Sequence, residues 1–158
     1  MKKIVLASDK AGFSLKESVK AYLITEGYEV LDIGTQDPEN PVFYYEVASR
    51  VAKKVRSGEY EKGVLFCGTG MGVSIVANKY SGVFAACCES IYAAEKARAN
   101  NDANILCMGG NILGPDNAIN MLKIFLKTEF GAGFTEERAV YLAGLKEKVV
   151  EIDKELRK

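Results

Sequence analysis

Residues 63–74 read GVLFCGTGMGVS, a short apolar run followed by three glycines at alternate positions and the start of a second apolar stretch. The run Gly63–Cys67 predicts a buried strand, and a helix is expected to begin near Met71. Glycines let the backbone of the intervening loop approach a ligand closely, and the first amides of the helix face the same space. The segment therefore predicts a strand, loop and helix that together stabilise an anion.

The same alternation of apolar runs and amphipathic stretches extends along the whole chain. The predicted strands are Lys3–Ala7, Glu29–Ile33, Gly63–Cys67, Val83–Cys87 and Asn104–Met108. Apolar residues at helical spacing between them, such as Leu15, Val19 and Leu23, predict covering helices. Near-continuous apolar strands joined by helices are typical of parallel sheets with right-handed crossovers. The predicted fold class is α/β, a doubly wound, Rossmann-like three-layer sandwich with a five-stranded parallel sheet, and strand order 2-1-3-4-5 is expected.

Composition indicates the kind of protein and the partners to expect. The chain has 158 residues, of which 48% are hydrophobic, so we expect a single domain over residues 1–158. Lysine plus arginine number 21 and aspartate plus glutamate number 21, which gives no overall field towards nucleic acid or an acidic membrane. The first apolar run is interrupted at Ser8, and no segment approaches the ~20 apolar residues of a membrane span. We therefore expect a cytoplasmic protein with no nucleic-acid or membrane partner.

The C-terminal stretch from Thr135 to Lys158 predicts a long helix with a narrow apolar stripe. The stripe consists of Leu142, Leu145, Val149, Ile152 and Leu156. A seam this narrow is typical of a helix that packs on another helix. We expect packing on a partner subunit, with packing on the chain's own sheet as the alternative.

Chemistry is expected at the carboxyl ends of the strands, near the point where strand order reverses. After the first strand, Asp9 and Lys10 place a carboxylate beside an ammonium, although Ser8 or Asp9 could instead cap the next helix. After the third strand, Cys67 lies at the edge of the glycine loop, where a thiolate is favoured and can act as a base or nucleophile. A buried structural cysteine is the alternative.

The absence of histidine, the residue at position 73 and the other cysteines limit the kinds of reaction that the chain can catalyse. The chain contains no histidine, which excludes histidine-dependent acid–base mechanisms and the commonest zinc sites. The phosphate loop of thiol phosphatases needs an arginine where Val73 stands, so that class is excluded. The remaining cysteines, Cys87, Cys88 and Cys107, lie in apolar strands and are expected to be core residues.

Four segments together resemble the family of type B ribose-5-phosphate isomerases and galactose-6-phosphate isomerases. They are residues 8–12 (SDKAG), 32–35 (DIGT), 67–79 (CGTGMGVSIVANK) and 101–109 (NDANILCMG). The resemblance covers residues 1 to about 140. It implies an aldose–ketose isomerase that needs no metal or other cofactor, works through a cis-enediolate, and forms a homodimer or a dimer of dimers with active sites at the subunit interface.

The resemblance also implies residue roles. The catalytic base of the family maps to Cys67, and its threonine partner maps to Thr69. The backbone amides from Gly68 to Gly72 would stabilise the charge on the enediolate oxygens. The residues expected to bind substrate are Asp9, Lys10, Tyr44, Gly68, Gly70, Met71, Gly72, Asn100, Asn101 and Arg138.

Departures from the family pattern lie in the substrate pocket. Lys10 and Asn100 stand where the family has histidines, one of which opens the furanose ring, and Phe134 replaces a phosphate-binding arginine, while Arg138 is retained. Lys10 can pair with a phosphate as a point charge. We therefore expect isomerisation of a sugar phosphate of the ribose 5-phosphate and ribulose 5-phosphate type. The alternatives are an open-chain or non-phosphorylated sugar, a sugar-phosphate-binding protein without turnover, and, most weakly, a phosphoryl carrier on Cys67.

Overall fold

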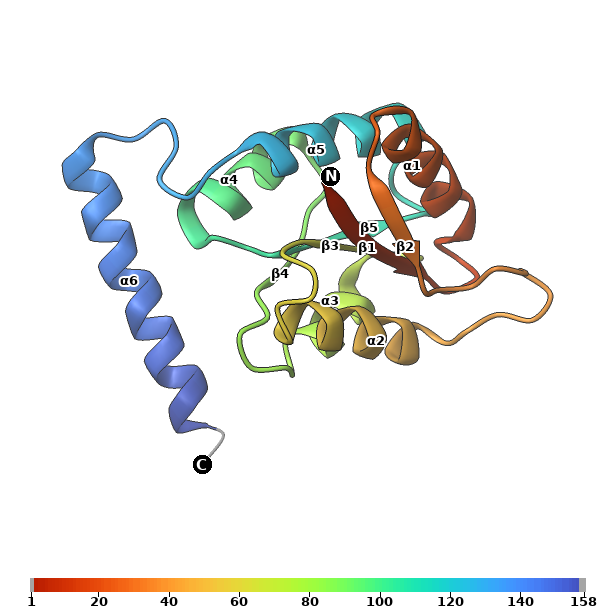
Figure 1. Ribbon diagram of the computed structural model, residues 1–158, viewed down its shortest axis with the longest axis horizontal. Helices are drawn as coiled ribbons and strands as arrows, with labels where there is room; N and C mark the ends of the chain where they lie inside the picture. Colours follow the sequence, from red (N-terminus) through yellow and green to blue (C-terminus); the bar gives the residue numbers. More distant parts are fainter. Residues whose placement is uncertain (1, 157–158) are drawn as a thin grey trace.

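The computed structural model in Figure 1 has a central sheet with helices on both faces and a last helix that stands apart from this body. The structure describes residues 2–156. The strands are β1 (Lys3–Ser8), β2 (Glu29–Asp32), β3 (Gly63–Cys67), β4 (Ala85–Cys87) and β5 (Ile105–Gly109). The helices are α1 (Phe13–Thr25), α2 (Tyr44–Arg56), α3 (Met71–Ala77), α4 (Ile91–Asn101), α5 (Pro115–Lys127) and α6 (Glu136–Glu155). Every strand pairing is parallel, so the predicted α/β class is confirmed.

The order of the strands is β2-β1-β3-β5-β4, so the predicted order 2-1-3-4-5 is wrong in its last two places. All five residues of β5 are buried, whereas none of the three residues of β4 is. The fully apolar strand lies inside the sheet, where both of its faces are covered, and the short, partly exposed strand takes the edge. β4 also begins later than predicted, because the Phe84 amide donates to the side chain of Asn104 at 2.8 Å.

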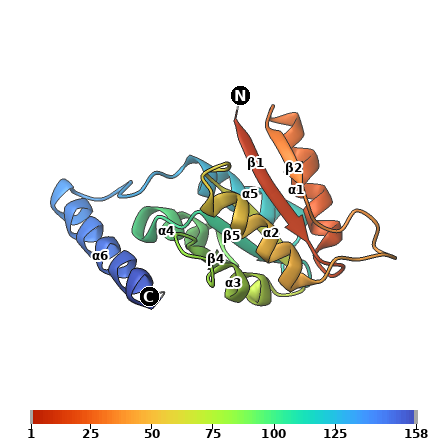
Figure 2. The same ribbon diagram turned by 60° about the horizontal axis from the view of Figure 1, so that its bottom comes forward.

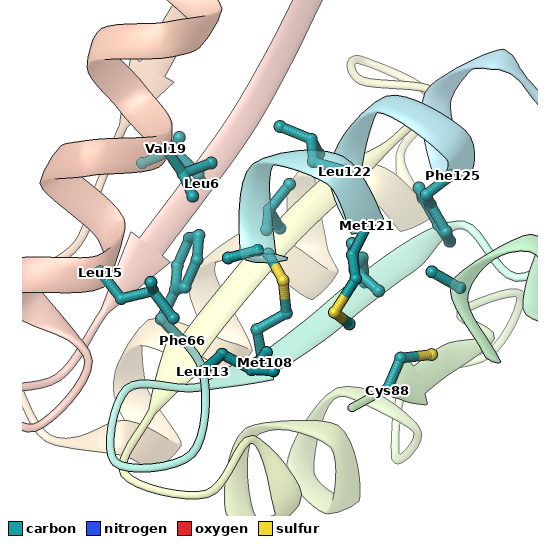
Figure 3. Packing of buried hydrophobic residues seen from close by; sticks show 14 of the residues in the cluster. Leu6, Leu15, Val19, Phe66, Cys88, Met108, Leu113, Met121, Leu122 and Phe125 are labelled. Atoms are coloured by element: carbon teal, nitrogen blue, oxygen red, sulfur yellow. The ribbon is translucent and has the colours of Figure 1, made fainter. Parts of the chain in front are cut away.

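Two apolar clusters fill the space between the sheet and its helices. Helices α1, α4 and α5 cover one face of the sheet, and α2 and α3 cover the other (Figures 1 and 2). In the first cluster Leu6 and Phe66 of the sheet lie beside Val19 and Leu15 of α1, and Met121 of α5 lies farther along the same layer (Figure 3). Burying a side chain of this size contributes about 1.5–3 kcal/mol. The apolar spacing in the sequence thus identified the covering helices correctly.

Helix α6 differs from the others because little of it is buried. Thr135 caps its first turn by accepting from the Arg138 amide, and of its residues only Leu142 is buried. Leu145, Val149 and Ile152 are 46%, 50% and 54% exposed, so most of the predicted apolar stripe is exposed to solvent in a single chain. The predicted end of the helix at Lys158 lies outside the described residues. Within residues 2–156, no helix is long and apolar enough to cross a membrane.

Candidate active site

The loops that follow β1, β3 and β5 meet beyond the carboxyl ends of these strands, because the three strands are neighbours in the sheet. The Asp9 amide donates to the Phe66 carbonyl at 3.3 Å, and the Gly110 amide donates to the Cys67 carbonyl at 2.8 Å. The strand order reverses between β1 and β3, which is where ligands of open parallel sheets bind. The predicted location of the chemistry is therefore a place where three loops are held together by backbone hydrogen bonds.

Cys67 ends β3 and is 5% exposed. Its Sγ accepts a hydrogen bond from the Gly70 amide at 3.1 Å. Gly70 has a φ of 77°, and a Cβ atom there would lie 3.0 Å from both Cys87 Sγ and the Met108 carbonyl carbon. Only glycine fits both the left-handed backbone and the space, so this residue lets the loop turn its amide towards the thiol.

The rest of the loop leads into α3. Thr69 Oγ1 accepts from the Met71 amide at 3.3 Å. A Cβ at Gly72 would lie 3.0 Å from two ring atoms of Tyr44, so the first turn of α3 packs directly against that ring. The structure therefore brings Tyr44, at the start of α2, to the same loop as Cys67 and Thr69.

The loop after β1 closes another side of this site. A Cβ at Gly12 would lie 2.9 Å from the Cys67 amide nitrogen, so the two loops are in contact. Asp9 Oδ1 accepts from the Gly12 amide at 3.0 Å in the turn before α1, and no side chain caps that helix, so the alternative capping role of Ser8 or Asp9 is wrong. Burial raises the pKa of Asp9 above its ordinary value and outweighs the hydrogen bonds from the Gly12 and Ala11 amides. Lys10 is exposed, and its Nζ lies 3.7 Å from Glu39.

The remaining predicted residues lie elsewhere in the chain. Asn100 and Asn101 line an apolar groove of about 600 Å³ between β4, α4 and α6. The Asn100 Oδ1 atom is buried and has no hydrogen-bond partner among the described residues. Arg138 lies on α6, where its guanidinium stacks on the ring of Tyr141 at 4.8 Å. One chain therefore brings the loop of Asp9 and the ring of Tyr44 to the Cys67 loop, and the groove that holds Asn100 and Asn101 is also lined by Cys87.

Two residues of the site were not foreseen. Cys87, expected in the core, is exposed, and its Sγ donates to the Thr69 carbonyl at 3.6 Å. Cys88 and Cys107 are buried as expected. Asn111 was not singled out, yet its Nδ2 lies 3.0 Å from the position of a Cβ at Gly68. The pair Gly109–Gly110 at the end of the fifth strand is the signal that could have directed attention to Asn111, since close backbone approach needs glycine there too.

Comparison with known proteins defines the class. Residues 4–141 match the Ribose/Galactose Isomerase family. The chain is 53% identical to 4-deoxy-4-sulfo-D-erythrose isomerase of Clostridium sp. (strain MSTE9), covering 98% of this chain and 97% of that protein. It is 38% identical to D-erythrulose-4-phosphate isomerase of Pectobacterium atrosepticum, over 84% and 88%. The structure of ribose-5-phosphate isomerase B from Clostridium thermocellum superposes with a TM-score of 0.89 at 40% identity, covering 98% and 99%.

The chain belongs to the ribose/galactose isomerase family. It is an enzyme that interconverts aldoses and ketoses, of the ribose-5-phosphate isomerase B type. The resemblance first seen in four short segments thus extends over nearly the whole chain and its fold.

Proposed function

We propose that this enzyme interconverts an aldose and a ketose of four carbons that carry an anionic group on carbon 4, with Cys67 as the base. The observation that carries the proposal is the hydrogen bond from the Gly70 amide to Cys67 Sγ at 3.1 Å. Such a bond stabilises a thiolate. A thiolate beside a loop of backbone amides can take a proton from the carbon next to a carbonyl while nearby donors stabilise the oxygen charge.

In the proposed reaction the Cys67 thiolate removes the proton from carbon 2 of the aldose. The electrons of the broken C–H bond form the double bond of a cis-enediolate, and the carbonyl oxygen takes the negative charge. The thiol then returns a proton to carbon 1, while the hydroxyl proton of carbon 2 passes to the oxygen of carbon 1. Thr69 is proposed to contact the reacting oxygens. Tyr44, packed on Gly72, and Asp9 are proposed to hold the sugar hydroxyls.

The length of the sugar is inferred from the absence of a ring-opening acid. A tetrose with sulfonate or phosphate on carbon 4 lacks the free hydroxyl that would close a five-membered ring, so it is already open. Lys10 and Asn100 stand where the family has histidines, and the chain contains none. The relatives named for 4-deoxy-4-sulfo-D-erythrose and D-erythrulose 4-phosphate support a four-carbon substrate. Because identity to the first is higher, we propose sulfonate as the preferred anion.

Incubation with a panel of sugars in deuterated water tests this assignment. We expect deuterium to enter 4-deoxy-4-sulfo-D-erythrose and its ketose beside the carbonyl, as followed by NMR. D-erythrose 4-phosphate should exchange more slowly, and ribose 5-phosphate at least about tenfold more slowly, because its ring must open first. Ribose 5-phosphate as the best substrate would contradict the proposed chain length. Binding of the sulfo-sugar without any exchange would contradict the proposal that this sugar is the substrate.

We further propose that the enzyme is a homodimer in which α6 packs on the second copy. Leu145, Val149 and Ile152 lie at helical spacing on α6 and are all exposed, and neighbouring exposed apolar side chains of this kind mark interaction surfaces. Asn100 and Asn101 line the groove beside α6. A second copy that contributes Arg138 and these amides would complete the site, with Lys10 as a further cation for the anion of the substrate.

Complementation between two inactive variants tests this arrangement. Cys67→Ala removes the base, and Arg138→Ala removes the cation proposed to reach the partner's site. If the two groups act together across the interface, co-expressed variants should recover about a quarter of wild-type activity, because half of the dimers are mixed and each of these has one intact site. Either variant alone should remain far below this level. No recovery in a mixed dimer isolated by two different tags would contradict a shared site.

We also propose a cytoplasmic location. All four cysteines are free thiols, and one of them, Cys87, is exposed. Free thiols are typical of a reducing compartment.

A further inference from the structure

The edge strand β4 ends at Cys87, whose side chain reaches the loop that follows Cys67. Cys87 Sγ donates to the Thr69 carbonyl at 3.6 Å. A Cβ at Gly70 would lie only 3.0 Å from the same sulfur atom. The thiol therefore contacts both residues of the Thr69–Gly70 peptide.

That peptide also carries the donor that faces Cys67. Its bond is trans, because no cis peptide occurs among the described residues. In a trans peptide the carbonyl oxygen and the amide hydrogen point in opposite directions. The Thr69 oxygen is directed at Cys87, and the Gly70 amide is directed at Cys67 Sγ at 3.1 Å. The peptide thus bridges the two thiols through opposite ends of one dipole.

A backbone contact and a side-chain clamp fix the peptide and the strand. A Cβ at Gly109 would lie 2.8 Å from the Thr69 carbonyl carbon, so the end of β5 supports the peptide from another side. Asn78, which follows α3, donates to the Ala85 carbonyl and accepts from the Ala85 amide, both at 2.8 Å. The helix that begins at the loop therefore also secures the strand that carries Cys87.

From this arrangement we propose that Cys87 is a positioning residue, whose thiol holds the Thr69–Gly70 peptide so that the Gly70 amide stabilises the Cys67 thiolate. The inference rests on the proposed role of Cys67 as the base. Cys87 has to keep its proton to act as the donor. Burial raises the pKa of Cys87, and the charges of Glu89 and Cys67 raise it further, which favours the protonated form of this thiol.

Three substitutions distinguish a positioning role of Cys87 from a role in packing alone. Cys87→Ala removes the donor, and Cys87→Ser keeps a donor of shorter reach. Cys88→Ala is the matched control, because it removes the neighbouring thiol, which is buried in the cluster on the opposite face of the sheet. For each protein the ultraviolet absorbance of thiolate is titrated with pH, and the titration of the same protein carrying Cys67→Ala is subtracted. Below the raised pKa of Cys87 the difference curve reports the ionisation of Cys67, and it needs no substrate.

In Cys87→Ala the midpoint of this curve is expected to rise by about half to one pH unit, since a hydrogen bond to the charged form is weakened. On a substrate that turns over, kcat should fall about three- to tenfold with KM unchanged. Cys87→Ser should lie between Cys87→Ala and wild type, and Cys88→Ala should keep the wild-type midpoint. An unchanged midpoint in Cys87→Ala, or an equal shift in Cys88→Ala, would overturn the proposal. A wrong substrate assignment would leave the titration unaffected.

Discussion

Replacing Cys67 with alanine is expected to lower kcat/KM by about 10²- to 10⁴-fold, the range that a positioned acid–base group contributes. The thiol is the group that the Gly70 amide stabilises, and the chain has no histidine to take over proton transfer. Exchange of the carbon-bound proton with solvent should be lost together with isomerisation, because both need the same proton transfer. The measurement is the isomerisation rate together with deuterium incorporation by NMR on the substrate that the panel identifies.

The control for this substitution is Cys88→Ala, which removes a thiol that is 3% exposed and lies on the opposite face of the sheet. It should retain most of the activity, even though a lost core contact lowers stability. Substrate should still bind to Cys67→Ala, because the thiol is proposed to act on a proton and not to hold the sugar. Retained exchange in Cys67→Ala would remove Cys67 from the mechanism, while the family assignment would stand.

Local patterns in the sequence were sufficient to predict the fold class and the Cys67 loop. Strand Gly63–Cys67 was predicted with its observed bounds, because a fully apolar run between polar residues has one interpretation in a parallel sheet. The order of β4 and β5 was not predicted correctly. That order depends on which strand buries both faces, a property of the assembled sheet that short apolar runs of similar composition do not encode.

Side-chain contacts between segments that are distant in the sequence were also not predicted. Cys87 lies 17 residues beyond Gly70 in the chain, and its apolar neighbours predicted a core position. Strand β4 is so short that its last residue reaches the loop and remains exposed. Asn100, Asn101 and Arg138 were predicted from resemblance alone, and their role at the Cys67 site stays a prediction.

Lys16 was not predicted to be buried, because it is a charged residue beside Leu15 in the apolar stripe of α1. It is 0% exposed, and its Nζ donates to Asp32 Oδ2 at 2.7 Å and to the Thr35 carbonyl at 2.6 Å. Thr35 in turn donates through its amide to the Ser8 carbonyl, and its hydroxyl accepts from the Val42 amide. This network joins α1 and β2 to the loops that carry Asp9 and Tyr44.

Replacing Lys16 with methionine is expected to lower the free energy of unfolding by about 3 kcal/mol or more, as when one partner of a buried ion pair is removed. Asp32, whose side chain is 6% exposed, would then keep only Lys20 as a cationic partner, at 2.8 Å. Chemical denaturation at neutral pH measures the loss. Activity should also fall, because the loops carrying Asp9 and Tyr44 lose their common anchor.

The pH dependence of stability gives a second test of the same network. Burial opposes the ionisation of Asp32, but hydrogen bonds from Lys16, Lys20 and the Gly34 amide outweigh it and lower the pKa of this carboxyl below its ordinary value. A lowered pKa in the folded state stabilises the protein above the ordinary carboxyl pKa of about 4, and this contribution is lost as the pH falls through the folded value. In Lys16→Met the free energy of unfolding should therefore fall less steeply with decreasing pH in this acid range.

Two further variants distinguish the ion pair from general core damage. Lys20→Met, which changes a partly exposed lysine of the same network, should cost less than Lys16→Met. Adding Asp32→Leu to Lys16→Met should restore part of the lost stability, because the buried carboxylate left with a single cationic partner is then gone. If the double variant is as unstable as Lys16→Met alone, the loss comes from the contacts of Lys16 with Thr35 and Glu17 and not from the uncompensated charge of Asp32.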